Sequence, residues 1–287
     1  MNVQTGDFAA ALLGAAAACG SYGILIEQFD IRVRLLELSF PNLPAAFDGF
    51  TILHLSDLHT TKFGLLERRL ANLLSQRETD LCVITGDISQ TLRASQAFHR
   101  LVDTVRRREP TVYAVLGNSE HKPWISTDAL IRALSREDLR FLINSSAALR
   151  RGEDSLVLVG VDDPYSRLAD LDSAFEGVNP EDFIIFLTHC PSTTPEAIKR
   201  GADLILAGHT HGGQIRLPFL GVLWSHMRAF RRLNDGLYTP ERLSKLLKRN
   251  CRSSVLFVNR GVGTSKFHVR FLCPPEIAYI TLRRATY

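Results

Sequence analysis

Short apolar runs that each end abruptly in a polar residue constrain this chain more than any other feature of its sequence. Six such runs are rich in Val, Ile, Leu and Phe and have the length of buried strands. They span residues 51–56, 81–85, 112–116, 156–161, 183–188 and 204–207. Between several of them lie amphipathic segments, at 65–77, 94–108 and 127–139, whose apolar residues recur every three or four positions. The alternation predicts an α/β fold in which helices cover a sheet.

The side chains that we select as candidate metal ligands follow five of these six runs. In an α/β fold, ligands bind beyond the carboxyl ends of the strands, so we expect these side chains to converge on one rim. The seven residues, in chain order, are Asp57, His59, Asp87, Asn118, His189, His209 and His211.

The spacing and chemistry of these residues favour a site for two metal ions. Asp57 and His59 are two residues apart at a strand end, where extended backbone points both side chains to the same face. His209 and His211 repeat the spacing, and the glycines at 212–213 allow the backbone to bend sharply. Oxygen ligands mixed with imidazoles suit Mn, which we favour, or Fe, Zn or Co. Seven ligands exceed the need of one ion, and two ions about 3.5–4 Å apart require a bridging anion.

Five ordered motifs resemble those of the calcineurin-like metallophosphoesterases. They are Ser-Asp57-Leu-His59, Thr-Gly-Asp87, Leu-Gly-Asn118, Thr-His189 and Gly-His209-Thr-His211. The resemblance covers roughly residues 50–213, and residues 256–265 and 271–276 resemble a bacterial branch with several membrane-linked members.

The resemblance implies a four-layer α/β/β/α sandwich of two mixed β-sheets flanked by helices. It also implies that one metal ion is held by Asp57, His59 and His211 and the other by Asn118, His189 and His209, with Asp87 as the bridge.

The expected catalytic residues are Asn118, His209, Glu120 and His121. Members of the family usually carry His directly after the metal-binding Asn, but this chain has Ser119 there, and His121 is displaced by two positions. An alkoxide leaving group needs a proton, whereas a phosphate monoester, with a second pKa near ~6, departs without one. The substitution favours pyrophosphate-type substrates. The alternatives are weak activity or a proton donor elsewhere in the chain.

Two segments suggest contact with a membrane. Residues 8–26 are uncharged and about long enough to cross a bilayer, so we interpret 1–30 as a candidate anchor or signal-like helix and 31–287 as the catalytic domain. A core helix is the alternative. Residues 215–249 mix apolar and basic side chains in a way that suits lipid headgroups, or else form a helical excursion packed on the domain. We therefore expect association with the cytoplasmic face of a bacterial inner membrane, with the cytoplasm as the alternative.

Charge and cysteine content add weaker constraints. The net charge of +4 favours an anionic substrate or surface, and no nucleic-acid recognition motif is present. Five cysteines without metal-type pairing suit a reducing compartment.

We expect a phosphohydrolase acting on a phosphodiester or pyrophosphate bond, with UDP-2,3-diacylglucosamine, giving UMP and a lipid monophosphate, as the candidate substrate implied by the resemblance. The alternatives are a general phosphodiesterase or phosphatase on soluble substrates and a catalytically weak metal-binding scaffold.

Overall fold

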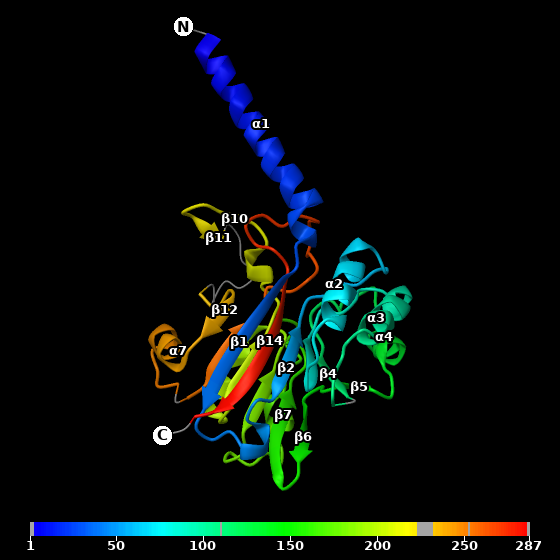
Figure 1. Cartoon of the computed structure of the whole chain (residues 1–287), viewed down its shortest axis with the longest axis vertical. Coiled ribbons are helices and arrows are strands. Elements are labelled where there is room, and N and C mark those ends of the chain that lie inside the picture. The colour runs from blue at the N-terminus through cyan, green and yellow to red at the C-terminus, as the bar shows by residue number, and fades with distance from the viewer. Residues whose placement is uncertain (1–2, 110, 223–231, 252, 286–287) are drawn as a thin grey trace.

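Two six-stranded sheets form the centre of the protein, which a computed structural model describes for residues 3–109, 111–222, 232–251 and 253–285 (Figure 1). The first sheet has the order β1-β14-β2-β3-β4-β5. Its strands β2 to β5 run parallel, whereas β14 is antiparallel to β2 and parallel to β1. The strands are β1 (Arg32–Phe40), β2 (Thr51–Leu55), β3 (Leu81–Thr85), β4 (Val112–Val115), β5 (Leu139–Phe141) and β14 (Glu276–Arg284).

The second sheet has the order β12-β13-β9-β8-β7-β6. Its four central strands are parallel, and the edge strands β6 and β12 are antiparallel to their neighbours. The strands are β6 (Ser145–Arg151), β7 (Asp154–Gly160), β8 (Ile184–Leu187), β9 (Leu204–Ala207), β12 (Gly236–Tyr238) and β13 (Val255–Val258). A separate hairpin consists of β10 (Arg216–Leu217) and β11 (Gly221–Val222).

Helices cover the outer face of each sheet, which confirms the predicted four-layer sandwich. The first sheet packs against α2 (Leu65–Ser75), α3 (Ser95–Val102) and α4 (Thr127–Leu134). The second packs against α5 (Leu171–Ala174), α6 (Thr194–Lys199) and α7 (Pro240–Leu247). A third apolar core fills the space between the sheets.

Alternation along the strands explains why they read as continuous apolar runs. Ile52 and Val83 pack into the core between the sheets, whereas Leu53 and Ile84 pack against the helices. Because both faces of these strands are covered, most positions are apolar and the period of two is hidden in the sequence.

Several predicted elements differ from the structure. Residues 255–259 and 277–282 have the sequence pattern of two strands that could pair as a hairpin. They do not pair, because β13 joins the second sheet and β14 is inserted between β1 and β2 of the first. The region 215–249 holds the β10–β11 hairpin, β12 and α7 rather than one helical excursion. Part of its apolar and basic sequence, at 223–231, lies outside the described residues.

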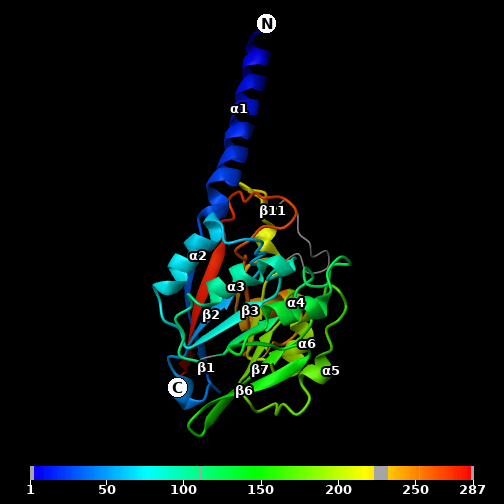
Figure 2. The same cartoon turned by 90° about the vertical axis from the view of Figure 1, so that its right-hand side faces the viewer.

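The N-terminal helix α1 (Val3–Leu25) projects away from the sandwich (Figures 1 and 2). It is not the core helix that we considered, since Leu13 and Leu25 are about 70% exposed (72% and 69%). Among the residues that the structure describes, no helix combines the length and the apolar character needed to span a bilayer. The base of α1 continues into a short helical turn, η1 (Glu27–Phe29), where the buried Glu27 accepts hydrogen bonds from the backbone N–H groups of Leu272 and Cys273.

Candidate metal centre

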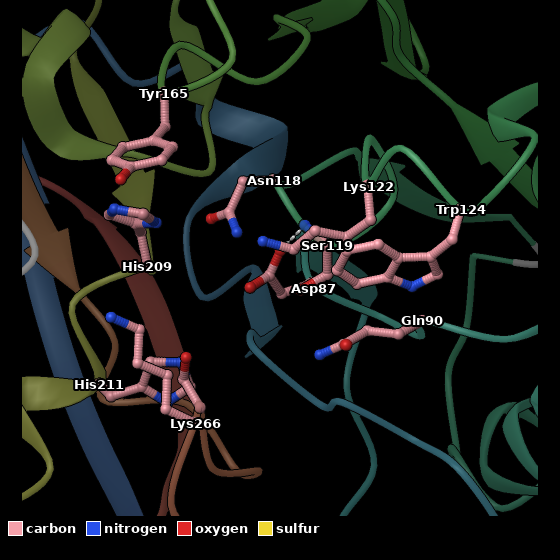
Figure 3. Close-up of a pocket in the computed structure, with 11 residues that line it drawn as sticks. Asp87, Gln90, Asn118, Ser119, Lys122, Trp124, Tyr165, His209, His211 and Lys266 are labelled. Carbon is pink, nitrogen blue, oxygen red and sulfur yellow. Dashed lines mark hydrogen bonds between the residues drawn. The ribbon is translucent and has the colours of Figure 1, made fainter.

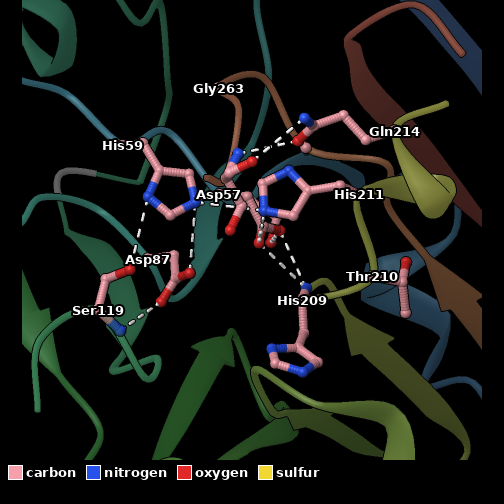
Figure 4. Close-up of polar contacts among 12 residues, drawn as sticks. Asp57, His59, Asp87, Ser119, His209, Thr210, His211, Gln214 and Gly263 are labelled. Atoms are coloured by element: carbon pink, nitrogen blue, oxygen red, sulfur yellow. Dashed lines mark hydrogen bonds and ion pairs between the residues drawn. The ribbon is translucent and has the colours of Figure 1, made fainter. Parts of the chain in front are cut away.

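Four of the seven predicted ligands converge at the carboxyl ends of the strands (Figure 4). Asp57, His59, Asp87 and His211 each offer a ligand atom, and these atoms all lie within 4.8 Å of one another. His59 Nε2 lies 3.4 Å from Asp87 Oδ2, and His211 Nε2 lies 3.3 Å from Asp57 Oδ1. The two Nε2 atoms of His59 and His211 are 3.2 Å apart. The four side chains thus form one group that could hold a cation.

The other predicted ligands adjoin this group through Asp87. His189 Nε2 lies 3.4 Å from Asp87 Oδ1 and 3.2 Å from His209 Nδ1. Asn118 and His209 line the same cavity as Asp87 (Figure 3). The two oxygens of Asp87 therefore face different imidazoles, one on each side.

The arrangement of hydrogen-bonding groups fits a bound cation. His189 Nδ1 lies 2.8 Å from the carbonyl oxygen of Thr85, which can only accept, so Nδ1 is the donor nitrogen. In the neutral imidazole, Nε2 must then be an acceptor, yet it faces a carboxylate oxygen of Asp87, which is also an acceptor. Either a proton or a metal ion has to lie between them. The mixture of imidazole and carboxylate donors suits the transition metals predicted from the sequence.

The pKa shifts of the site residues also favour a bound cation. Burial lowers the pKa of His189, but the carboxylates of Asp87 and Asp57 outweigh it and raise the pKa to about 9. Burial raises the pKa of Asp87, but His189 and His59 bring it down to about 2. For Asp57, burial dominates and raises the pKa. The carboxylates hold positive charge at this place, and a divalent cation can displace the proton from an imidazole.

The backbone at the site differs from the extended conformation that we predicted. Asp57, His59, Asp87, His209 and His211 all have positive φ, between 46° and 69°. β2 has already ended at Leu55, so the side chains converge because of left-handed loop backbone rather than the strand pleat. Such conformations are uncommon outside glycine, although Asp and His adopt them more readily than most residues. Their concentration here is typical of a functional site.

Two glycines allow these loops to approach each other closely. A Cβ atom at Gly208 would lie 1.8 Å from Ser56 Oγ and 2.4 Å from Asp57 Oδ2. A Cβ atom at Gly117 would lie 2.4 Å from Asp87 Oδ1. A side chain at either position would push a carboxylate out of place.

Glu120 is bound by backbone N–H groups of the loops around Asp87. Its carboxylate is fully buried and accepts hydrogen bonds from the backbone N–H groups of Asp87, Ser89 and Gly117, at 3.1, 3.0 and 2.8 Å. Burial and the neighbouring Asp87 raise the pKa of Glu120 to about 8, whereas the backbone donors act in the opposite direction. We therefore propose that Glu120 is a positioning residue that joins the loops carrying Asp87 and Asn118.

Ser119 and His121 each contact a neighbouring carboxylate. The backbone N–H of Ser119 donates to Asp87 Oδ1 at 2.8 Å, and its side chain lines the cavity. His121 Nε2 lies 2.6 Å from Asp162 Oδ1, and this hydrogen bond raises the pKa of His121. The imidazole of His121 is not among the groups that line the cavity. We propose that His121 fixes the loop after Asn118 rather than acting on substrate.

The cavity also contains residues that the sequence analysis did not select (Figure 3). Its volume is about 290 Å³, and the additional lining residues are Gln90, Lys122, Trp124, Tyr165, Ser265 and Lys266. The ring of Tyr165 lies 5.0 Å from that of His209. Tyr165 follows the carboxyl end of β7, a signal that could have identified it, whereas Trp124, which is 72% exposed, carries no comparable signal.

The chain is similar in sequence to known phosphoesterases. The family model described as "Calcineurin-like phosphoesterase" matches residues 50–213. The chain is 27% identical to the uncharacterized metallophosphoesterase YkuE of Bacillus subtilis, covering 97% of this chain and 95% of that protein. It is 26% identical to the UDP-2,3-diacylglucosamine pyrophosphatase LpxG of Chlamydia trachomatis, covering 88% of this chain and 89% of that protein. It is 28% identical to the phosphodiesterase YaeI of Escherichia coli, covering 81% and 82%.

Proposed function

The chain belongs to the calcineurin-like phosphoesterase family and is a metal-dependent phosphoesterase, and we propose that it uses two divalent ions to cleave a pyrophosphate bond in an amphipathic substrate. The observation that carries the two-ion proposal is the position of Asp87, whose two oxygens each face an imidazole at 3.4 Å. A single carboxylate between two sets of ligands is the bridging anion that a pair of cations requires.

The remaining ligands divide on either side of Asp87. We assign Asp57, His59 and His211 to one ion, since they cluster around Asp87 Oδ2. Those assigned to the other ion are Asn118, His189 and His209. When bound, such ions supply charge that offsets the phosphoryl oxygens and acidify a water molecule for attack on phosphorus. Mn, Fe, Zn and Co all suit this donor set, and Mn is our preferred candidate.

The protein's own residues position the substrate. Lys122 and Lys266 line the cavity and offer positive charge to the non-reacting phosphate of the substrate. Trp124 offers an exposed aromatic face on which a ring of the substrate could stack. Because Ser119 carries a hydroxyl instead of an imidazole, the position after Asn118 lacks a general acid that works near neutral pH. A leaving phosphate monoester needs none, so these residues favour a pyrophosphate over a simple alkyl ester.

The exposed apolar side chains around the base of α1 support a substrate presented at a lipid surface. Ile24, Leu25 and Ile26 are 47–69% exposed. Phe219 of the β10–β11 hairpin and Phe267 of the loop before β14 are also exposed. The hairpin lies at the same end of the molecule as the base of α1 (Figures 1 and 2). The relative LpxG is named for UDP-2,3-diacylglucosamine, which combines a pyrophosphate with acyl chains. We therefore propose this class of substrate and association with the cytoplasmic face of a bacterial inner membrane.

The test compares two substrates and two variants. The protein is purified in mild detergent and reconstituted with Mn, and the cleavage of UDP-2,3-diacylglucosamine is measured beside that of an aryl phosphodiester. Asp87→Asn removes the bridging charge with little change of shape. Asp128→Asn, at an exposed carboxylate in the first turn of α4, is the matched control. Bound metal is counted in each sample.

The expected result is release of UMP that depends on Asp87 and is unchanged in Asp128→Asn, with about two Mn ions per wild-type chain. Turnover of the aryl diester alone would instead favour a general phosphodiesterase, the activity for which the relative YaeI is named. Two bound ions without turnover of either compound would point to a metal-binding scaffold and overturn the proposal.

A further inference from the structure

A second and larger cavity lies beside the metal centre, at the base of α1. Its volume is about 800 Å³. Gln90 and Lys266 line both this cavity and the one that contains Asp87, and His59 lies in its wall. A ligand at the metal centre could therefore extend into the second cavity without leaving the protein surface. We call it the side cavity.

The walls of the side cavity are largely apolar. Phe29 of η1, Leu58 of the loop after β2, and Leu65 and Leu66 at the start of α2 contribute to it. Leu65 is 51% exposed, which is high for a leucine that begins a helix packed on a sheet. Exposed apolar groups that line a concave surface are a common sign of a ligand site.

Ionisable side chains lie among these apolar walls, and most of them are basic residues. Lys62, Lys266 and His268 line the side cavity, and Glu67 is its acidic residue. Glu67 is engaged locally, because its Oε2 accepts a hydrogen bond from the backbone N–H of Gly64 at 2.9 Å. The combination of apolar wall and basic groups suits a ligand that is apolar along its length and anionic at one end.

We propose that the side cavity binds the alkyl or acyl chain of an amphipathic phosphate compound whose phosphate lies at the metal centre. The proposal rests on the phosphoesterase function above and specifies where the apolar part of its substrate binds. The volume falls within the roughly 300–1,000 Å³ of typical ligand cavities. The location at the base of α1, beside the exposed Ile24, Leu25 and Ile26, gives a chain drawn from a lipid surface a short path inward.

The experiment measures binding rather than turnover. Octyl phosphate and butyl phosphate share a headgroup and differ by four methylene groups, and their dissociation constants for the Mn-loaded protein are obtained by calorimetry. Burial of each methylene strengthens binding by up to roughly fourfold. We expect octyl phosphate to bind at least about tenfold more tightly than butyl phosphate to the wild-type protein, allowing for incomplete burial.

Leu65→Gln keeps the size of the side chain and adds no charge. In this variant octyl phosphate should bind only about 1–3 times more tightly than butyl phosphate. Leu65 is half-exposed and helices tolerate Gln, so we expect the variant to fold, and thermal unfolding checks this. Leu35→Gln is the matched control, because Leu35 is 58% exposed on β1 and lines neither cavity. The control should retain the wild-type ratio.

The outcomes separate this inference from the proposed function. A wild-type ratio near one, or a ratio that Leu65→Gln leaves unchanged, would overturn the side-cavity assignment even if lipid pyrophosphate is cleaved. A chain-length preference that depends on Leu65, found in a protein that cleaves no lipid pyrophosphate, would uphold the side cavity while refuting the proposed reaction.

Discussion

Substitution of Glu120 by Gln tests whether this residue positions the metal-binding loops or takes part in the chemistry. When it is ionised, above its pKa of about 8, the carboxylate of Glu120 accepts three backbone hydrogen bonds, two at Oε2 from Asp87 and Gly117 and one at Oε1 from Ser89. An amide offers only one acceptor oxygen. Whichever way it is turned, at least one backbone N–H loses its partner and faces another donor.

The expected loss of stability follows from that count. A buried donor left without a partner costs about 1–3 kcal/mol, so Glu120→Gln should lower the free energy of unfolding by about 2 kcal/mol. For a domain of this size that corresponds to a Tm roughly 4–8 °C lower. The loops carrying Asp87 and Asn118 should also lose alignment, which reduces metal affinity by about 10–100-fold, the range seen for groups that orient metal ligands.

The assay combines thermal unfolding of the metal-stripped protein, Mn titration, and the pH profile of diester turnover. Glu153→Gln is the control, since Glu153 is exposed in the turn between β6 and β7. A variant with wild-type Tm and metal affinity but a much reduced kcat would refute the positioning role. It would return Glu120 to the catalytic role predicted from the sequence.

Two further changes probe the packing and the charges around the site. Gly208→Ala places a Cβ atom 1.8 Å from Ser56 Oγ and 2.4 Å from Asp57 Oδ2, so we expect displacement of Asp57 and roughly a 100-fold fall in kcat/KM. Gly20→Ala, where a Cβ meets nothing within 4 Å, is the control, and equal turnover by both variants would contradict the steric argument. His121→Gln removes an imidazole whose pKa is raised by the hydrogen bond to Asp162. A raised folded-state pKa contributes stability that is complete below the unfolded value of about 6.5 and is lost as the pH rises through the folded pKa. Urea unfolding should therefore show wild type more stable than His121→Gln by about 1 kcal/mol at pH 6, with a smaller gap at pH 9, and a gap independent of pH would exclude this linkage.

The central strands could be predicted from the sequence because burial on both faces makes each of them a short apolar run. The candidate ligands could be predicted because they follow the ends of these runs. The runs that became β3 and β9 have the bounds that were predicted. By contrast, β1 was missed because it is an edge strand that mixes Arg32, Arg34 and Glu37 with apolar residues. Its partner β14 lies near the other end of the chain, so the pairing cannot be predicted from a local sequence pattern.

The roles of individual polar residues were harder to predict than their proximity. Glu120 lies beside the site as expected, but its partners are backbone N–H groups from three separate positions, and residue type carries no information about those. Similarly, the spacing of Asp57 and His59 was read as a strand feature. Left-handed backbone achieves the convergence instead, and only the loops packed around both residues determine that conformation.

The loop between Gly261 and Pro275 explains how the base of α1 and the metal centre can be built as one unit. On one side, Glu27 holds the loop through the backbone N–H groups of Leu272 and Cys273. On the other, the fully buried Arg270 donates to the carbonyl oxygens of Gly261 and Gly263 and lies 3.5 Å from His211 Nδ1.

The same loop packs closely against two of the candidate metal ligands, Asp57 and His59. A Cβ atom at Gly261 would lie 2.5 Å from the Cβ of Asp57, and one at Gly263 would lie 2.9 Å from the Cβ of His59. A shift of the α1 base would therefore reach the ligands through packed contacts rather than through a flexible linker. If α1 meets a lipid surface as we propose, the loop would hold the metal centre and the side cavity at a fixed height above it. A substrate anchored by its acyl chains could then be cleaved while those chains remain close to the bilayer.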